Sequence, residues 1–233
     1  MSLSLLDISN NNLAALPPTI FRKSSSLQKL FLQNNSLSLL SGDLFTGLEA
    51  LLLLNMSHND ISSHLLSDRI FTGLPKLVAL DLSYNSLTKL EGRTLAQQNN
   101  LQILNLQHNS LANIAYDSFS NLINLHILLL SHNQLTELPP SSLSSLTSLS
   151  SLSLDHNRLA LLAPGLLQGS PLLQDLALNN NYLDSVPQDV SSLTKLRTLD
   201  LGENRIRSVL AHQLENLDSL YGLRLAGKSA RSR

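Results

Sequence analysis

An eleven-residue pattern recurs along the whole chain at an almost fixed spacing. The pattern is LxxLxLxxNxL, with isoleucine or methionine allowed in place of leucine, and successive copies begin 23 to 26 residues apart. Such a period restricts a chain to a solenoid, because each repeat is one unit that buries its apolar face only against its neighbours. Nine copies are nearly complete and a tenth lacks the asparagine; they begin at Leu3, Leu27, Leu51, Leu77, Leu101, Leu125, Leu149, Leu173, Leu196 and Leu220.

This period and consensus are typical of leucine-rich repeats. Leu104 and Leu106 alternate with the polar Asn105 and Gln107, which predicts one short strand per coil. We therefore expect an α/β leucine-rich-repeat solenoid of about ten coils. Its strands would form a concave parallel sheet, and its convex side would be mostly loops and short helical or 3-10 turns. The repeats assign residues 1–227 to the solenoid and 228–233 to a tail outside the pattern.

An asparagine occupies the ninth position of the pattern, inside an apolar row. The chain must turn there while its backbone is still buried, and an inward-pointing amide can bond the backbone of its own coil and of a neighbouring coil. We therefore assign these residues a structural role, as a ladder of stacked amides. The ladder consists of Asn11, Asn35, Asn59, Asn85, Asn109, Asn133, Asn157, Asn181 and Asn204.

A second apolar position lies six residues before each new repeat. These residues are expected to stack along the outer side of the core as packing residues and not as a cofactor site. This spine consists of Phe21, Phe45, Phe71, Leu95, Phe119, Leu143, Leu167, Val190 and Leu214.

The composition excludes several classes of function. The chain has 233 residues, is 42% hydrophobic, and carries a formal net charge of −1, so a nucleic-acid-binding surface is not expected. It has no cysteine, which removes disulfides, thiolate zinc sites and thiol nucleophiles. A shallow curved sheet offers no closed pocket, and no glycine-rich phosphate loop is present. We expect no enzymatic activity and no cofactor.

The residues left for function are those expected to project from the strand face, at positions 3, 5, 7 and 8 of the pattern. The middle coils carry an apolar strip there and the later coils carry acidic side chains. An exposed apolar strip beside an acidic patch suits a protein partner. The candidate partner-binding residues are Phe31, Ile103, Ile127, Leu129, Tyr84, His132, His156, Asp155, Asp175, Asp200, Glu203 and Arg224.

Position 8 carries a row of histidines interrupted by one tyrosine: His58, Tyr84, His108, His132 and His156. Neighbours in this row should lie about 5 Å apart. A row of this kind suits either a metal site or a pH-sensitive surface. Histidines stacked at one strand spacing do not converge on a tetrahedral point, so no metal is expected.

Two sequons are present, Asn34-Asn35-Ser36 and Asn55-Met56-Ser57. Asn34 and Asn55 are therefore candidate glycosylation sites. A glycan on Asn55 would project from the concave face and keep a bulky partner away from the early coils.

Several segments resemble one family of receptors. The 24-residue coils with phenylalanine after the asparagine, as in "LSLLSGDLFTGLEA" and "LANIAYDSFSNLIN", resemble the extracellular class of leucine-rich repeats. "LQILNLQHNSL", "NLHILLLSHNQL", "LRTLDLGENRI" and the longer coil "NDISSHLLSDRIFTGLPKLVALDLSYNSL" are similar to insect Toll receptor ectodomains, the Tollo-like branch in particular. The similarity covers residues 1–227.

The resemblance implies an internal piece of the ectodomain of a single-pass type I receptor of innate immunity or development, on the extracellular side of the plasma membrane. It implies a secreted ligand of the cystine-knot cytokine type or another receptor ectodomain as partner, with homodimer formation as a further option. It does not imply nucleic-acid binding, and membrane attachment would use a span outside this sequence. Two alternatives stay open: an intracellular leucine-rich-repeat scaffold, favoured by the "LPP" segments and the lack of cysteine, and a self-associating adhesion protein.

Overall fold

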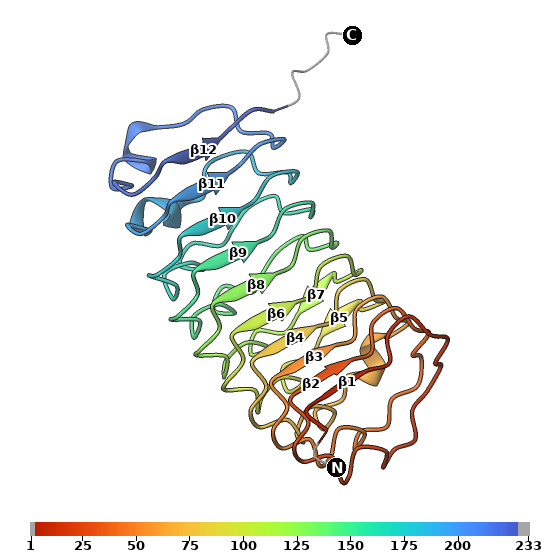
Figure 1. The fold of residues 1–233 in the computed structure, drawn as a ribbon. Helices are drawn as coiled ribbons and strands as arrows, with labels where there is room; N and C mark the ends of the chain where they lie inside the picture. Colours follow the sequence, from red (N-terminus) through yellow and green to blue (C-terminus); the bar gives the residue numbers. More distant parts are fainter. Residues whose placement is uncertain (1–2, 228–233) are drawn as a thin grey trace, which may run out of the picture.

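The computed structural model describes residues 3–227 and shows a curved solenoid in which every coil adds one strand to a parallel sheet (Figure 1). The sheet has ten strands in the order β1-β2-β3-β4-β6-β8-β9-β10-β11-β12. The strands are β1 (Leu5–Asp7), β2 (Lys29–Phe31), β3 (Leu53–Asn55), β4 (Ala79–Asp81), β6 (Ile103–Asn105), β8 (Ile127–Leu129), β9 (Ser151–Ser153), β10 (Asp175–Ala177), β11 (Thr198–Asp200) and β12 (Gly222–Arg224).

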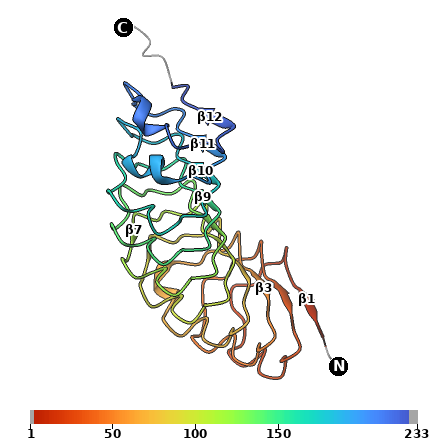
Figure 2. The same cartoon turned by 90° about the vertical axis from the view of Figure 1, so that its left-hand side faces the viewer.

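The register of the sheet places equivalent residues of the pattern side by side. Position 3 pairs with position 3, as in Ile103 with Ile127, and position 5 pairs with position 5, as in Asn105 with Leu129. The coils fan around a curved axis with the strands on the inner side (Figure 2). The expected concave parallel sheet is therefore confirmed.

The core is built from the leucines of the pattern and from the predicted spine. The middle residue of each internal strand points inward and is almost completely buried, as Leu104 and Leu128 are. The spine is buried from Phe21 to Val190 and partly buried at Leu214. Its first three phenylalanine rings stack, with centroids 6.4 Å apart for Phe21 and Phe45 and 6.3 Å apart for Phe45 and Phe71.

The asparagine ladder has the predicted inward orientation. The side-chain amide of Asn133 donates to the carbonyls of Leu106 in the preceding coil (3.0 Å) and Leu130 in its own coil (3.0 Å). Its oxygen accepts the N–H of Leu111 at 2.9 Å. The Leu130 carbonyl also accepts from Asn157 of the next coil, so two asparagines share this carbonyl.

The convex side consists mainly of turns, as expected, with three short 3-10 helices: η1 (Ser63–Leu65), η2 (Gln188–Ser192) and η3 (Ala211–Gln213). A second, two-stranded parallel sheet was not predicted from the sequence. It joins β5 (Lys89–Leu90) to β7 (Asn113–Ile114).

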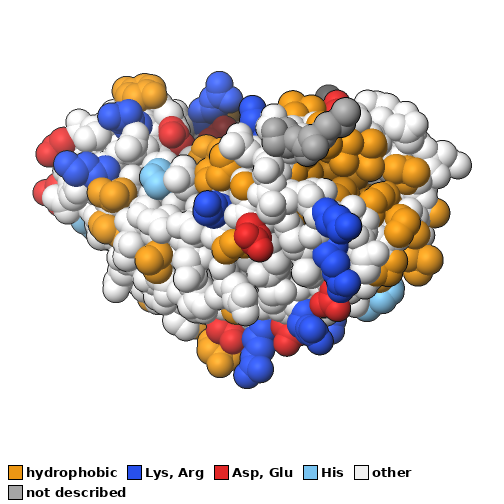
Figure 3. Space-filling model, turned by 60° about the horizontal axis from the view of Figure 1, so that its bottom comes forward, with side chains coloured by type: hydrophobic (Ala, Val, Ile, Leu, Met, Phe, Trp, Pro, Cys, Tyr) orange, Lys and Arg blue, Asp and Glu red, His pale blue; other side chains and the backbone are white. Residues whose placement is uncertain are grey.

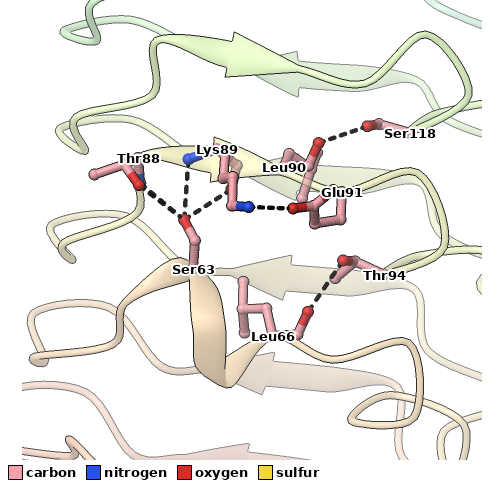
Figure 4. A network of polar contacts seen from close by, with 8 residues as sticks. All are labelled: Ser63, Leu66, Thr88, Lys89, Leu90, Glu91, Thr94 and Ser118. Carbon is pink, nitrogen blue, oxygen red and sulfur yellow. Dashed lines mark hydrogen bonds and ion pairs between the residues drawn. The ribbon is translucent and has the colours of Figure 1, made fainter.

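The 26-residue coil carries η1, and the Ser63 side chain ties this helix to the next coil (Figure 4). The Ser63 Oγ accepts the N–H groups of Thr88 and Lys89, each at 2.9 Å, and donates to the Lys89 carbonyl at 2.8 Å. Figure 4 also shows Thr94 and Ser118 donating to the carbonyls of Leu66 and Leu90 in the coil before each. Hydroxyl groups therefore link adjacent coils by hydrogen bonds at the convex turns, as the asparagine amides do at the turns beside the sheet.

Thr94 and Ser118 each lie directly before the spine residue of their coil. The equivalent position in a later coil holds the buried Asp189. Its two oxygens accept the N–H groups of Gly165 and Leu167 at 2.9 and 3.0 Å. This carboxylate is a structural staple between two coils.

Nowhere in residues 3–227 does a helix reach the length and hydrophobicity that a membrane crossing needs. The predicted tail at 228–233 lies outside the described residues.

Candidate protein-recognition face

The first half of the concave face carries an apolar strip, formed by Phe31, Leu53, Ile103, Ile127 and Leu129. Their strands place them at positions 3 and 5, which project away from the core. Ile103 is exposed and the other four are half-buried. Phe31, Leu53, Ile103 and Leu129 line one shallow hollow of about 200 Å³, together with the polar Asn55, Asp81 and Asn105. The structure thus gathers residues that are up to 98 positions apart in the sequence, Phe31 to Leu129.

The second half of the same face is hollowed and acidic. The corresponding positions on β9 to β12 carry mostly small side chains, and they leave a hollow of about 310 Å³. Asp175 and Asp200 lie in this hollow, together with Arg224. The lining is completed by Ser151, Leu152, Ser153, Leu176, Ala177, Thr198, Leu199 and Gly222.

Each carboxylate in the acidic hollow is anchored through one oxygen. Asp175 Oδ1 accepts the Thr198 hydroxyl, and Asp200 Oδ1 accepts the Gly202 N–H at 3.0 Å. Asp200 Oδ2 lies 3.7 Å from the Arg224 guanidinium, whose side chain is 81% exposed. A surface ion pair of this kind contributes about 0–1 kcal/mol, so a partner can displace Arg224 at little cost.

The histidine row forms a continuous stack of rings along the turn that follows the strands. Ring centroids are 4.0 Å apart for His58 and Tyr84, 4.1 Å for Tyr84 and His108, 4.1 Å for His108 and His132, and 4.0 Å for His132 and His156. Neighbouring rings are within 12° of parallel. The spacing is shorter than the 5 Å expected from the strands.

The backbone at position 8 explains the regularity of this stack, which we call the ring column. In each of the nine complete copies the residue at this position is left-handed, with φ between 51° and 55°. Asparagine and histidine tolerate this conformation better than most residues, whereas a tyrosine there is unusual. The column continues beyond the rings as Asn10 and Asn34 at one end and Asn180 and Glu203 at the other.

The expected direction of the side chains at position 7 of the pattern was wrong. These side chains were predicted to project from the concave face, but Ser57, Ser83 and Ser131 are buried there. The chain already begins to turn at this position, and short hydroxyls bond inward: Ser83 Oγ donates to Asp81 Oδ1 at 2.7 Å. Asp155 occupies position 7 and is half-buried, and its Oδ1 accepts the Ser131 hydroxyl.

The pKa of His132 is lowered from its ordinary value. Partial burial of the imidazole is the main cause, followed by repulsion from His156 and His108, while Asp155 opposes the shift. Within the ring column, this shift favours the neutral imidazole of His132.

The sequence-predicted residues fall into three groups in space. The apolar strip and the acidic hollow lie on one face, and Glu203 joins Asp200 and Arg224 around a second hollow beside β12. Tyr84, His132 and His156 belong to the ring column, and Asp155 lies beside it and not in the acidic hollow. Sequence reasoning missed this last grouping because it treated position 7 as part of the strand face.

Figure 3 views the structure from the side of the first coils and shows hydrophobic side chains gathered there, with charged side chains scattered over the rest. Leu3 and Leu5 are 51% and 47% exposed.

Of the two sequon asparagines, Asn34 is exposed and donates to Asn10 Oδ1 at 2.8 Å. Asn55 is half-buried, and its Oδ1 accepts the Ser57 N–H at 2.9 Å.

Comparison with known proteins agrees with this architecture. The solved TLR13–ssRNA13 complex contains a chain that is 32% identical over 89% of this protein, with a TM-score of 0.81. The Drosophila Toll–Spätzle complex gives 27% identity over 96%, with a TM-score of 0.77. The present chain covers only 30% and 33% of those two chains.

A third similar structure is the octameric complex of Latrophilin 3, Unc5D and the leucine-rich-repeat domain of FLRT2. One chain of this complex is 25% identical to the present chain over 94% of its length, with a TM-score of 0.81. The present chain covers 74% of that chain. A search among curated proteins found no significant match. The family model described as "Leucine rich repeat" matches residues 1–61, 64–111, 99–159 and 171–228. The protein therefore belongs to the leucine-rich repeat family, as a protein-interaction module that resembles the ectodomains of Toll receptors and other receptors of this class.

Proposed function

We propose that this chain is part of the ligand-binding ectodomain of a Toll-like receptor of the insect Tollo-like branch, on the extracellular side of the plasma membrane. Its partner is a secreted protein of the cystine-knot cytokine type or another receptor ectodomain. The observation that carries the proposal is that the apolar strip and the acidic hollow lie on one concave face, where β8 of the strip pairs with β9 of the hollow.

The two parts of this face have different roles in binding. The apolar strip supplies a driving force of roughly 25 cal/mol for each Å² that a partner covers. The acidic hollow selects a partner with a basic protrusion and raises its association rate. A ligand that places an apolar ridge on Ile103 and Leu129 and a lysine or arginine near Asp175 would satisfy both parts.

The similar structures support a receptor role. One is a complex of Toll with Spätzle, and another contains a leucine-rich-repeat domain within an assembly of receptors. Because this chain covers about a third of the Toll chain, it would supply part of such a recognition surface.

Charge reversal at Asp175 and Asp200 is expected to weaken binding and to flatten its salt dependence. Surface plasmon resonance would measure binding of a panel of purified cystine-knot cytokines and receptor ectodomains to the wild-type chain. For the partner that binds, the Asp175→Lys/Asp200→Lys variant should lose about tenfold or more in affinity, mainly through a slower association rate.

A matched variant separates the face from general charge effects. Asp43→Lys/Asp60→Lys changes the net charge equally, at two surface residues outside the acidic hollow, and should leave the affinity within about twofold. Ile127→Asp should weaken binding through the apolar strip. Absence of binding to every member of the panel, or binding that neither face variant weakens, would contradict the proposed function.

Glycosylation gives an independent test of the extracellular assignment. On expression in insect cells with a secretion signal, Asn34 should carry an N-linked glycan, because its side chain is exposed on a turn. Asn55 should be modified too, since transfer precedes folding, and its glycan would keep a bulky partner away from the early coils. Intact-mass spectrometry of wild-type, Asn34→Gln and Asn55→Gln proteins measures each site. Secretion with neither site occupied would argue against the extracellular assignment.

A further inference from the structure

The ring column meets a carboxylate at one place. Among the nine complete copies of the repeat, position 7 holds serine, glutamine, asparagine or glycine in eight and an acidic residue only in Asp155. Asp155 directly precedes His156, and His132 stacks on His156 from the preceding coil. Two imidazoles and one carboxylate therefore come together on adjacent coils.

These three side chains are close enough to share one ion. His132, Asp155 and His156 each offer a ligand atom, and these atoms lie within 4.8 Å of one another. The Ser131 hydroxyl donates a hydrogen bond to Asp155 Oδ1, and this bond orients the carboxylate and leaves Oδ2 available. A hydrogen bond of this kind is the usual outer support of a carboxylate that binds a metal ion.

We propose that His132, Asp155 and His156 form a binding site for a divalent transition-metal ion, with zinc as the representative ion. Imidazole nitrogen and carboxylate oxygen are the ligands that zinc, copper and nickel take in proteins. Both histidines are exposed, so the remaining coordination positions face solvent and are open to water or to a side chain of a bound protein. This site is separate from the acidic hollow and does not depend on the proposed function.

The stack as it stands must open slightly to bind the ion. Parallel rings direct their nitrogen lone pairs side by side, whereas two nitrogens on a tetrahedral zinc ion at about 2.1 Å lie roughly 3.4 Å apart. From a separation of up to 4.8 Å, closure on the order of 1 Å is required. Small side-chain rotations at two exposed rings supply this movement, and the bonds to the metal replace one ring contact.

The other ring pairs of the column lack this combination. His58 stacks on Tyr84, and position 7 of its coil is Ser57. His108 stacks on His132, but Gln107 precedes it and Ser131 precedes its partner. His58 is therefore a matched control within the same column.

Isothermal titration calorimetry with zinc chloride at neutral pH tests the site. Asparagine is the substitution of choice because the column itself carries asparagine at Asn34 and Asn180, in the same left-handed conformation. Wild-type protein should bind one zinc ion, His132→Asn and His156→Asn should each weaken binding roughly tenfold or more, and Asp155→Asn should also weaken it. His58→Asn should bind as wild type does.

A second measurement identifies the ligands directly. In NMR spectra of the wild-type protein, zinc should shift the imidazole signals of His132 and His156 and leave those of His64, His126 and His212 unchanged. Absence of saturable binding at millimolar zinc would overturn the proposal. Equal zinc affinity of the His132→Asn, His156→Asn and His58→Asn proteins would also overturn the proposal. Circular dichroism would verify that all three variants are folded.

Discussion

Replacing Asn133 with alanine should destabilise the protein by roughly 2–6 kcal/mol. The Leu111 N–H loses its acceptor in a buried turn, at about 1–3 kcal/mol. Two carbonyl bonds of 3.0 Å are lost at about 0.5–1.5 kcal/mol each, together with a longer bond of 3.3 Å to the Ser131 carbonyl. The Leu106 and Leu130 carbonyls keep a second asparagine each, which limits the loss. Urea unfolding followed by circular dichroism measures the change.

The exposed end of the same ladder provides the control. Asn11 is exposed and makes only two side-chain bonds, to the carbonyls of Ile8 and Ser9. Asn11→Ala should therefore change the free energy of unfolding by about 0.5 kcal/mol. Equal losses for Asn11→Ala and Asn133→Ala would show that burial does not decide the contribution of the ladder.

Replacing Phe45 with alanine should cost roughly 3–5 kcal/mol, because the ring is fully buried and the coils on either side cannot collapse into the space. The ring also stacks between Phe21 and Phe71, and both contacts would be lost. Chemical denaturation measures this variant in the same way.

A leucine at the same place separates volume from ring stacking. Leu95 and Leu143 hold the equivalent spine position in other coils, so the backbone accepts leucine there. Phe45→Leu should cost roughly 1–2 kcal/mol. A loss as large as that of Phe45→Ala would mean that stacking, and not buried volume, stabilises this part of the spine.

The repeat predicted the architecture of the chain closely because every coil obeys the same constraints. Strand position, inward leucines, the spine and the asparagine ladder all follow from the period and from the need to bond buried backbone groups. These elements depend on contacts between equivalent positions of adjacent coils, which a regular pattern reveals directly.

Features that break the repeat were not predicted. Ser63 lies in the one longer coil, and its bonds to Thr88 and Lys89 depend on the path of an insertion that the pattern does not describe. Strands β5 and β7 have two residues each, too few for a visible alternation. Asp189 resembles a surface aspartate in the sequence, and only the neighbouring coil reveals its partners.

The candidate site was predicted in part. Phe31, Ile103 and Leu129 were assigned to one face, and the register of the sheet brings them together. Asp155 was grouped with Asp175 and Asp200, although it lies beside His132 and His156. The difference arises because position 7 begins the turn, where strand alternation no longer gives the direction of a side chain.

Hydrogen exchange of asparagine side-chain amides, followed by nitrogen-15 NMR, tests most directly that stacked coils are joined by an inward column of amides. The amide protons of Asn109, Asn133 and Asn157 should exchange roughly a hundredfold or more slowly than those of the exposed Asn99 and Asn113. Exchange of the ladder amides at the rate of the exposed ones would place them in solvent and contradict the structure described here.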